Sequence, residues 1–183
     1  MSRRYKFRAQ DKLYFVTFAT VYWIDVFSRK TYRDILLDSI RYCQAYKGLE
    51  VYAWCLMTNH VHLIIGTNKE PMENILRDLK KYTSVKILEA IQSNTHESRR
   101  EWMLWVFARA GKRNANNKHY QFWQQHNRPI ELSNYQMAQQ KLAYIHHNPV
   151  EAGIVLSPHE YLYSSAKSYA GMNDALLEVL FLG

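Results

Sequence analysis

Hydrophobic and polar positions along the chain follow two periods, and each change of period marks a new expected element. Residues 13–21 are rich in β-branched and aromatic side chains, a composition typical of a buried or half-buried strand. Apolar positions recur with helical spacing over residues 31–46, which predicts a helix. Two further β-rich runs, at 49–57 and 60–66, are separated by a short polar break and predict a hairpin. The sheet is therefore expected to be at least partly antiparallel.

The second half of the chain continues with a helical pattern and then with strand-like runs. Pro71 suits the first turn of a helix, and an amphipathic pattern extends from it to about Ile91. The aromatic run at 102–107 lies between two polar stretches and is interpreted as a strand, with another short strand at 120–123.

A last helix, expected over residues 133–147, completes the pattern. Ser133 can cap its start, and Pro149 disfavours helical geometry at Asn148, where the helix should end. The order strand, helix, hairpin, helix, strand, helix indicates an α+β fold, with a ferredoxin-like antiparallel sheet and helices packed on one face of it. A chain of 183 residues that is 48% hydrophobic can build one sizeable core, so residues 1–183 are expected to form a single domain.

Charge and cysteine content narrow the setting in which the protein works. The formal net charge of +8 favours a polyanionic partner such as a nucleic acid, although it also fits an ordinary basic protein. The apolar stretches fall short of the roughly 20 residues that span a bilayer, and the basic N-terminus lacks the apolar run of a secretory signal. We therefore expect a cytoplasmic protein in which Cys43 and Cys55 are buried thiols rather than a disulfide.

Two histidines carry the strongest chemical signal. In the run Asn59-His60-Val61-His62-Leu63, strand alternation sends His60 and His62 to the same face. Two such imidazoles can chelate a divalent cation if a third ligand comes from elsewhere, whereas the alternative is a solvated pair on an edge strand. A histidine-triad nucleotide hydrolase would place a third histidine at position 64, where this chain has Ile64.

A second signal lies in the last expected helix. Tyr144 and Asn148 are four residues apart, so they lie on one helical face and can approach the same ligand. Taken alone, a helical tyrosine is more typical of packing than of catalysis, and His146 and His147 are interpreted as solvated or hydrogen-bonded.

Together the two segments resemble the HUH single-strand nucleases, and within them the single-tyrosine transposases related to bacterial REP-associated tyrosine transposases and IS200-like transposases. The resemblance covers a core of about residues 12–170 of one transposase domain. It rests on these blocks, which occur in the family's order: Trp54-Cys-Leu-Met-Thr-Asn-His60-Val-His62-Leu, Leu79-Lys-Lys-Tyr-Thr-Ser84, Phe122-Trp-Gln124, Tyr144-Ile-His-His-Asn-Pro-Val-Glu-Ala-Gly153 and Tyr161-Leu-Tyr-Ser-Ser165. The family implies a ferredoxin-like fold with the two histidines on a central strand and a nucleophilic tyrosine on a following helix.

Residue by residue, the resemblance implies a metal centre beside a nucleophile. His60 and His62 match the family's metal ligands, Tyr144 its nucleophile, and Asn148 its third ligand, where some relatives have Gln. An amide oxygen suits a hard cation, so Mg²⁺ or Mn²⁺ is the expected cofactor, although two imidazoles would also accept softer metals.

The function implied is that of a metal-dependent single-strand DNA endonuclease and strand transferase that forms a covalent 5′-phosphotyrosine intermediate at hairpin-containing repeat DNA. One alternative is a catalytically silent, sequence-specific DNA-binding protein descended from such enzymes, which would keep the basic surface. Another is a hydrolase of small phosphoesters that uses the same histidines without a covalent tyrosine. Related proteins occur as monomers and as homodimers with shared active sites, so both states stay open, and the DNA partner would place the protein at the nucleoid.

Single-stranded DNA is usually held by cationic grooves and by aromatic side chains that stack on bases. Trp102, Trp105 and Trp123 are interpreted as core residues rather than stacking platforms. Basic side chains gather at the N-terminus, on the second helix and in the following loop, and each has a solvated surface as its alternative. The candidate DNA contacts are Arg3, Arg4, Lys6, Arg8, Lys80, Lys81, Arg109, Lys112 and Arg113.

Overall fold

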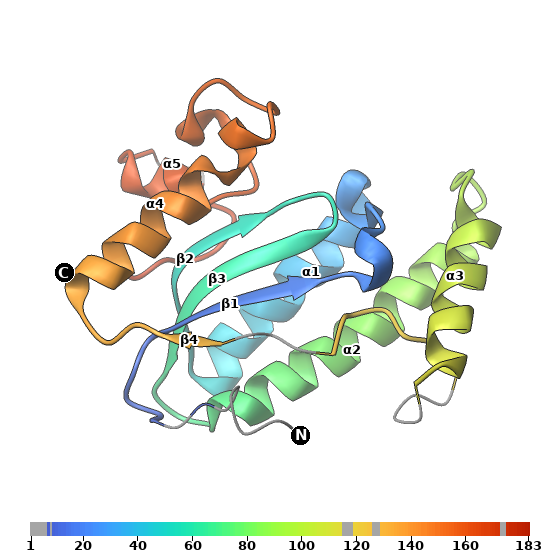
Figure 1. Cartoon of the computed structure of the whole chain (residues 1–183), viewed down its shortest axis with the longest axis horizontal. Helices are drawn as coiled ribbons and strands as arrows, with labels where there is room; N and C mark the ends of the chain where they lie inside the picture. Colours follow the sequence, from blue (N-terminus) through green and yellow to red (C-terminus); the bar gives the residue numbers. More distant parts are fainter. Residues whose placement is uncertain (1–6, 8, 115–118, 126–128, 173–174) are drawn as a thin grey trace.

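A four-stranded antiparallel sheet forms the centre of the molecule (Figure 1). Its order is β2-β3-β1-β4, with β1 at Tyr14–Ala19, β2 at Leu49–Leu56, β3 at His60–Thr67 and β4 at Ile130–Glu131. Both strands of the expected hairpin are present, and β3 lies between β2 and β1. The computed structural model describes residues 7, 9–114, 119–125, 129–172 and 175–183.

The pairing of β1 with β3 decides which side chains share a face. Thr17 is opposite His62, and Phe15 is opposite Ile64, so these four side chains lie on one face of the sheet. Phe18 is opposite Val61 and therefore belongs to the other face.

Two long helices cover the face that carries Phe18. Helix α1 (Lys30–Tyr42) packs against α2 (Met72–Ser93), and both lie behind the sheet in Figure 1. The amine of Lys80 on α2 lies 5.4 Å from the ring centroid of Phe18, which assigns α2 to this face. The buried side chains of α2 recur three or four residues apart, the helical period that the sequence predicted. The α+β fold with an antiparallel sheet is therefore confirmed.

Helix α4 (Tyr135–Glu151) lies across the opposite face of the sheet. The sequence predicted helices on one face only, so this second layer was not expected. The ring of Tyr144 on α4 lies 5.9 Å from that of Phe15, centroid to centroid. The face that carries the two histidines is thus covered by the helix that carries the tyrosine. Short helical turns complete the described chain: η1 (Val21–Trp23), η2 (Val26–Ser28), η3 (Cys43–Lys47), η4 (Pro158–Glu160) and α5 (Ala166–Tyr169).

The start and end of α4 differ from the sequence prediction by a few residues. Asn134, rather than Ser133, caps the helix, because its side-chain oxygen accepts a hydrogen bond of 2.9 Å from the amide of Met137. The helix also continues through Pro149 to Glu151. Pro149 is buried on the packed face of the last turn, and this tertiary contact outweighs the local preference against helix before proline.

The strand predicted at 102–107 is wrong, because this stretch lies in helix α3 (Arg100–Lys112). Its buried residues Met103, Val106, Phe107 and Ala110 are three or four positions apart, as a helix requires. A short aromatic run satisfies strand and helix patterns equally well, and only packing distinguishes them.

The short strand predicted at 120–123 is also wrong, since Trp123 makes only an isolated bridge with Thr20. The fourth strand of the sheet is β4, a few residues further along, where a two-residue pairing leaves little sequence signal.

The expectation of buried thiols is confirmed, because Cys43 and Cys55 are both buried and neither forms a disulfide. Across the described ranges, the helices are all too short or too polar to cross a membrane.

Candidate active site

His60 and His62 project from β3 to the same face, as strand alternation predicted. Their ring centroids are 4.6 Å apart. His62 is 5% exposed, and its Nδ1 lies 2.7 Å from the Thr17 hydroxyl on the neighbouring strand. Its Nε2 is buried and has no hydrogen-bond partner among the described residues. A buried polar nitrogen without a partner is costly, which marks this atom as a position for a ligand.

His60 connects the sheet to two other elements. Its Nδ1 lies 2.6 Å from the side-chain oxygen of Asn59, and the Asn148 side chain on α4 is hydrogen-bonded to the same imidazole. The ring of Trp23 approaches its edge at 5.5 Å between centroids. His60 and Asn148, which are both predicted metal ligands, are therefore in contact.

Burial keeps both imidazoles neutral near pH 7. It lowers the pKa of His60 below its usual value, which the hydrogen bond with Asn148 only partly offsets. It lowers the pKa of His62 to about 3, and repulsion from Lys141 and from the protonated form of His60 acts in the same direction. Neutral imidazole is the form that binds metal ions.

Tyr144 stands at the rim of this site, 41% exposed. Its ring lies 5.2 Å from that of His62, centroid to centroid. The Lys141 amine, three residues earlier on α4, lies 5.5 Å from the Tyr144 ring and 4.7 Å from the Phe15 ring. A half-exposed phenol thus lies beside a cation and the buried histidine pair, within reach of a ligand that approaches from solvent.

A buried hydrogen-bond cluster fixes α4 on the sheet. The Nε2 of His146 lies 2.9 Å from the hydroxyl of Ser165. That hydroxyl also bonds the backbone of Trp54 on β2, accepting from its amide at 2.9 Å and donating to its carbonyl at 3.2 Å. His147 faces outwards, with Nδ1 3.0 Å from the Ala143 carbonyl oxygen. The interpretation of these two histidines as hydrogen-bonded agrees with these contacts.

The donor set at this site fits a divalent cation. Imidazole nitrogens suit divalent first-row transition metals, whereas an amide oxygen suits harder cations such as Mg²⁺ and Mn²⁺. The buried Nε2 of His62, which has no partner among the described residues, is available to such an ion. The described residues include no cluster of three or more His, Cys, Asp or Glu side chains, and the side chain next to His60 is the amide of Asn148.

Comparison with known families identifies the chain. Its sequence matches the family model described as "Transposase IS200 like" over residues 10–108, more than half of its 183 residues. The chain belongs to the IS200-like transposase family. The match includes both histidines of the site but ends before α4, so Tyr144 and Asn148 lie outside the matched part of this transposase.

Two solved structures resemble this IS200-like chain. One, a REP-associated tyrosine transposase bound to a REP hairpin, has a TM-score of 0.66 and 17% sequence identity, covering 100% of this chain and 95% of that chain. The other, a candidate transposase from Deinococcus radiodurans R1, has a TM-score of 0.45 and 18% identity, covering 78% of this chain and 95% of that chain. The first likeness shows the shared fold, and the second is too weak to add to it. No curated protein matches the chain.

The predicted DNA contacts of this transposase are distributed unevenly. Arg3, Arg4, Lys6 and Arg8 lie outside the described residues, and the exposed candidates are Lys81, Arg109, Lys112 and Arg113. Lys80 is half-buried, and its amine donates a 2.8 Å hydrogen bond to the backbone carbonyl of Gln124.

The tryptophans of this transposase correct part of the sequence interpretation. Trp123 is a core residue as expected, only 6% exposed. Trp102 and Trp105, interpreted as core residues, are 50% and 57% exposed, because α3 turns them away from its packed face.

Sequence reasoning missed three side chains of the site. Thr17 belongs to the site because the register of β1 and β3 pairs it with His62, and this register has no signal in the sequence. Trp23 approaches from η1, which had no strand or helix pattern. Lys141 could have been found, because it is three residues before Tyr144 and therefore close to it on any helix.

Proposed function

We propose that this protein is a metal-dependent single-strand DNA endonuclease and strand transferase in which Tyr144 is the nucleophile. The observation that carries the proposal is the position of the Tyr144 ring, 5.2 Å from the ring of a buried histidine whose Nε2 lacks a partner among the described residues. A phenol, two neutral imidazoles and a neighbouring amide are the groups that covalent phosphodiester cleavage requires.

The proposed reaction is a reversible transesterification. The phenol oxygen of Tyr144 attacks the scissile phosphorus and forms a new phosphorus–oxygen bond, while the bond from phosphorus to the 3′ oxygen breaks. The phenolic proton is lost to solvent, and the 3′ oxygen takes up a proton to become a free hydroxyl. The 5′-phosphotyrosine keeps the phosphodiester energy, so a later 3′ hydroxyl can reverse the step without ATP.

Each side chain of the site has a defined task in this reaction. A divalent cation bound by His60, His62 and Asn148 would supply charge neutralisation at the scissile phosphate. Thr17 orients His62 through their 2.7 Å contact, which directs Nε2 away from β1. Lys141 provides a positive charge close to the Tyr144 ring, where negative charge develops during attack.

Hairpin-containing single-stranded DNA is the proposed substrate. A structural relative with a TM-score of 0.66 was solved bound to a REP hairpin, and the present chain carries a formal net charge of +8. Four of the predicted contacts are exposed and support binding to a phosphate backbone: Lys81 on α2, and Arg109, Lys112 and Arg113 in or next to α3.

Covalent capture tests the proposal directly. The protein is incubated with Mg²⁺ or Mn²⁺ and a pool of labelled hairpin oligonucleotides whose single-stranded flanks are randomised, and adducts are resolved by denaturing electrophoresis. We expect an adduct that is lost in Tyr144→Phe and on chelation, and that persists in Tyr135→Phe, an exposed tyrosine of the same helix.

Two other outcomes would contradict the proposal. DNA binding without any adduct would favour a DNA-binding protein that has lost catalysis. Undiminished turnover of a small phosphoester by Tyr144→Phe would favour a metal-dependent hydrolase that does not use a covalent tyrosine.

A further inference from the structure

Two adjacent aromatic residues in η1 are held in an unusual backbone conformation. Tyr22 and Trp23 have φ angles of 54° and 56°, in the left-handed region that bulky residues rarely adopt. The segment is fixed by hydrogen bonds from the Val21 amide to the Phe122 carbonyl and from the Asn59 side chain to the Trp23 carbonyl. Nevertheless, the two side chains are 54% and 53% exposed. Strained backbone that presents large rings to solvent is a feature of binding sites rather than of packing.

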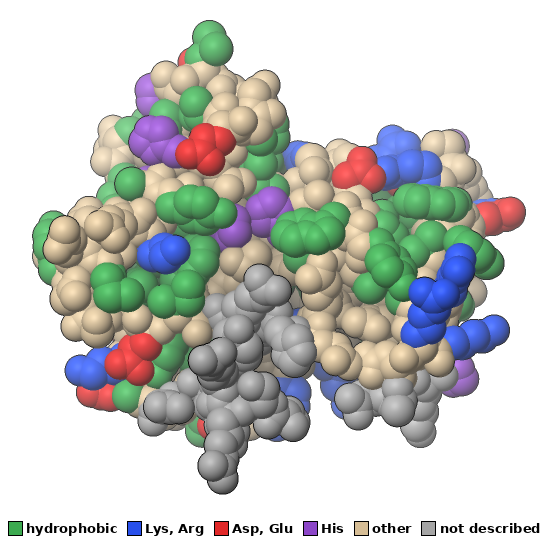
Figure 2. Space-filling model, in the orientation of Figure 1, with side chains coloured by type: hydrophobic (Ala, Val, Ile, Leu, Met, Phe, Trp, Pro, Cys, Tyr) green, Lys and Arg blue, Asp and Glu red, His purple; other side chains and the backbone are tan. Residues whose placement is uncertain are grey.

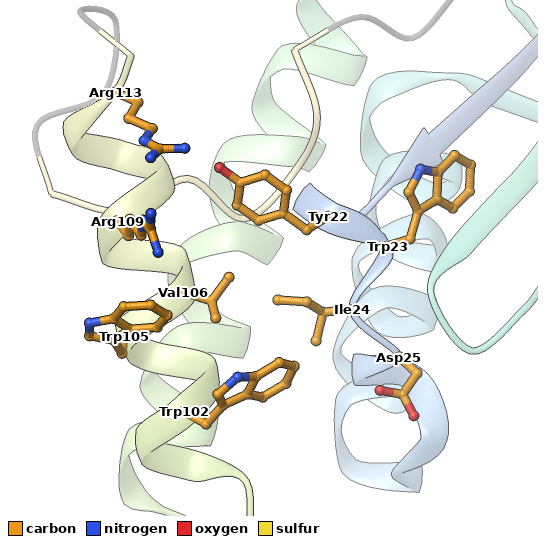
Figure 3. A pocket seen from close by; sticks show the side chains of 9 residues that line it. All are labelled: Tyr22, Trp23, Ile24, Asp25, Trp102, Trp105, Val106, Arg109 and Arg113. Carbon is orange, nitrogen blue, oxygen red and sulfur yellow. The ribbon is translucent and has the colours of Figure 1, made fainter.

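Helix α3 provides a second aromatic wall opposite Tyr22. Between η1 and α3 lies an open cleft of about 490 Å³, a size suited to a small ligand. Figure 3 shows the ring of Tyr22 pointing toward α3, and the ring of Trp102 pointing toward Ile24. Val106 contributes a further apolar surface. The cleft therefore offers two exposed aromatic side chains on opposing elements.

The charges around this cleft are mainly positive. Arg109 and Arg113 line it from α3, and the guanidinium carbon of Arg109 lies 5.2 Å from the ring centroid of Trp105. Its acidic residue, Asp25, forms a 2.6 Å ion pair with Arg99. Figure 2 shows basic and apolar side chains gathered together on the side of the molecule where α3 lies. A ligand with both a flat apolar group and a negative charge would match this combination.

Tyr22 and Trp23 of η1 connect the cleft to the candidate active site. Trp23 points away from α3 in Figure 3, and its ring lies 5.5 Å from that of His60. Asn59 donates to the Trp23 carbonyl at 3.2 Å and contacts His60 Nδ1 through its side-chain oxygen at 2.6 Å. A strand held in the cleft by Tyr22 would thus pass over Trp23 to reach the histidines.

We propose that this cleft binds one unpaired nucleotide of the DNA flank, with its base stacked at Tyr22 and Trp102 and its phosphate at Arg109 and Arg113. The inference rests on the proposed DNA-processing function and specifies where the single-stranded flank is held. Nucleotides combine a stacking face with a phosphate, and proteins that hold single strands use aromatic side chains beside cations for this purpose. A protein segment is less suited, because two exposed arginines beside the aromatic wall favour an anion.

A fluorescent base reports directly on stacking. The probes are a hairpin with a flank of thymidines, in which 2-aminopurine replaces each flank position in turn, and the same hairpin without a flank. Because base–aromatic stacking tolerates any base, the generic flank suffices at low salt. We expect 2-aminopurine fluorescence to be quenched at one flank position in the unaltered protein, and the quenching to be lost in Trp102→Ala.

Affinity provides a second readout with matched controls. Trp102→Ala and Arg109→Ala should each weaken binding of the flanked hairpin roughly tenfold, the effect of losing one stacked base or phosphate contact, and leave the hairpin without a flank unchanged. Tyr46→Ala removes an exposed aromatic ring on η3, and Arg77→Ala removes an exposed guanidinium on α2; neither should affect binding of the flank. All four side chains are exposed, and unfolding curves verify that each variant is folded.

The outcomes separate this inference from the function on which it rests. Unchanged quenching and affinity in Trp102→Ala and Arg109→Ala, with the Tyr144 adduct still formed, would overturn the cleft assignment alone. Equal losses for both hairpins would also overturn it, since the cleft would then not be specific for the flank. Failure of the unaltered protein to bind either DNA would overturn the function and the cleft together.

Discussion

The rings of His62 and Tyr144 meet at 5.2 Å between centroids, at an interplanar angle of 67°, although one residue belongs to β3 and the other to α4. The contact lies above Phe15, whose ring is stacked on His62 at 5.5 Å. Because His62 is buried and Tyr144 is half-exposed, the pair spans the boundary between the sheet and solvent. A ligand bound at this boundary can contact both residues at once.

Replacing Thr17 by valine should weaken metal binding. The Thr17 hydroxyl lies 2.7 Å from Nδ1 of His62 and therefore holds the imidazole ring in place relative to β1. Valine keeps the shape of the β-branched side chain but removes the contact, so we expect the affinity for Mn²⁺ to fall about 10- to 100-fold. Calorimetric titration with Mn²⁺ measures this change.

The matched controls for Thr17 distinguish orientation from packing. Thr17→Ser keeps the hydroxyl and should restore most of the affinity, whereas Thr31→Val, on an exposed position of α1, should have no effect. An unchanged affinity in Thr17→Val would show that the hydroxyl does not position His62.

Replacing Lys141 by glutamine should slow chemistry more than binding. Its amine lies 5.5 Å from the Tyr144 ring centroid, so it favours the negative charge that develops on the phenol oxygen. We expect the single-turnover rate of adduct formation to fall about tenfold, equivalent to about 1.4 kcal/mol, while the Kd for DNA changes less than about threefold. Lys141→Arg should retain most of the rate.

The control for Lys141 is Lys30→Gln, which removes one exposed charge on α1 that pairs with Asp34. Parallel losses of rate and affinity in Lys141→Gln would instead indicate a phosphate contact.

The sequence predicted those parts of the site that depend on local periodicity. Strand alternation placed His60 and His62 on one face, and helical spacing placed Tyr144 one turn before Asn148. The approach of the two pairs depends on long-range packing, including the bonds of Ser165 that fix α4 on β2. Such contacts leave no periodic signal in the sequence, so only the family resemblance anticipated that the two segments would meet.

The error in α3 has a different cause and hid the proposed nucleotide cleft. The run Trp102 to Phe107 is aromatic and contains a β-branched valine, which favours a strand as much as a helix. As a helix it buries Phe107 and exposes Trp102 and Trp105, whereas a core strand would have buried them. Because the run was interpreted as a strand, Trp102 and Trp105 were assigned to the core, although both are exposed and line the proposed cleft.

The stability of the protein should rise between neutral and alkaline pH because of Lys80. Burial lowers the pKa of its amine from 10.5 to about 8 in the folded protein, whereas the unfolded chain keeps the ordinary value. Between these two pKa values the unfolded state binds more protons, so the free energy of unfolding increases with pH. From pH 7 to 9.5 the gain attributable to Lys80 is on the order of 2 kcal/mol.

Urea unfolding at both pH values measures the gain as a difference between variants. Lys80→Met should lack the increase, whereas Lys81→Met, at the exposed neighbouring position, should retain it. Equal pH dependence in Lys80→Met and the unaltered protein would contradict the shifted pKa.

Removing the Ser165 hydroxyl should destabilise the protein and impair catalysis together. Ser165→Ala leaves Nε2 of His146, a residue only 8% exposed, without its 2.9 Å partner and also removes the contacts with the Trp54 backbone. A buried polar group left unsatisfied costs about 1 to 3 kcal/mol, so the free energy of unfolding should fall by that amount. Since the cluster fixes α4 on β2, adduct formation by Tyr144 should also slow while the protein remains folded.

Ser168→Ala makes the same change three residues further along, on α5, and should alter neither the free energy of unfolding nor the rate of adduct formation. If Ser165→Ala matched Ser168→Ala in unfolding curves and in adduct rate, the cluster would not be what positions the tyrosine helix.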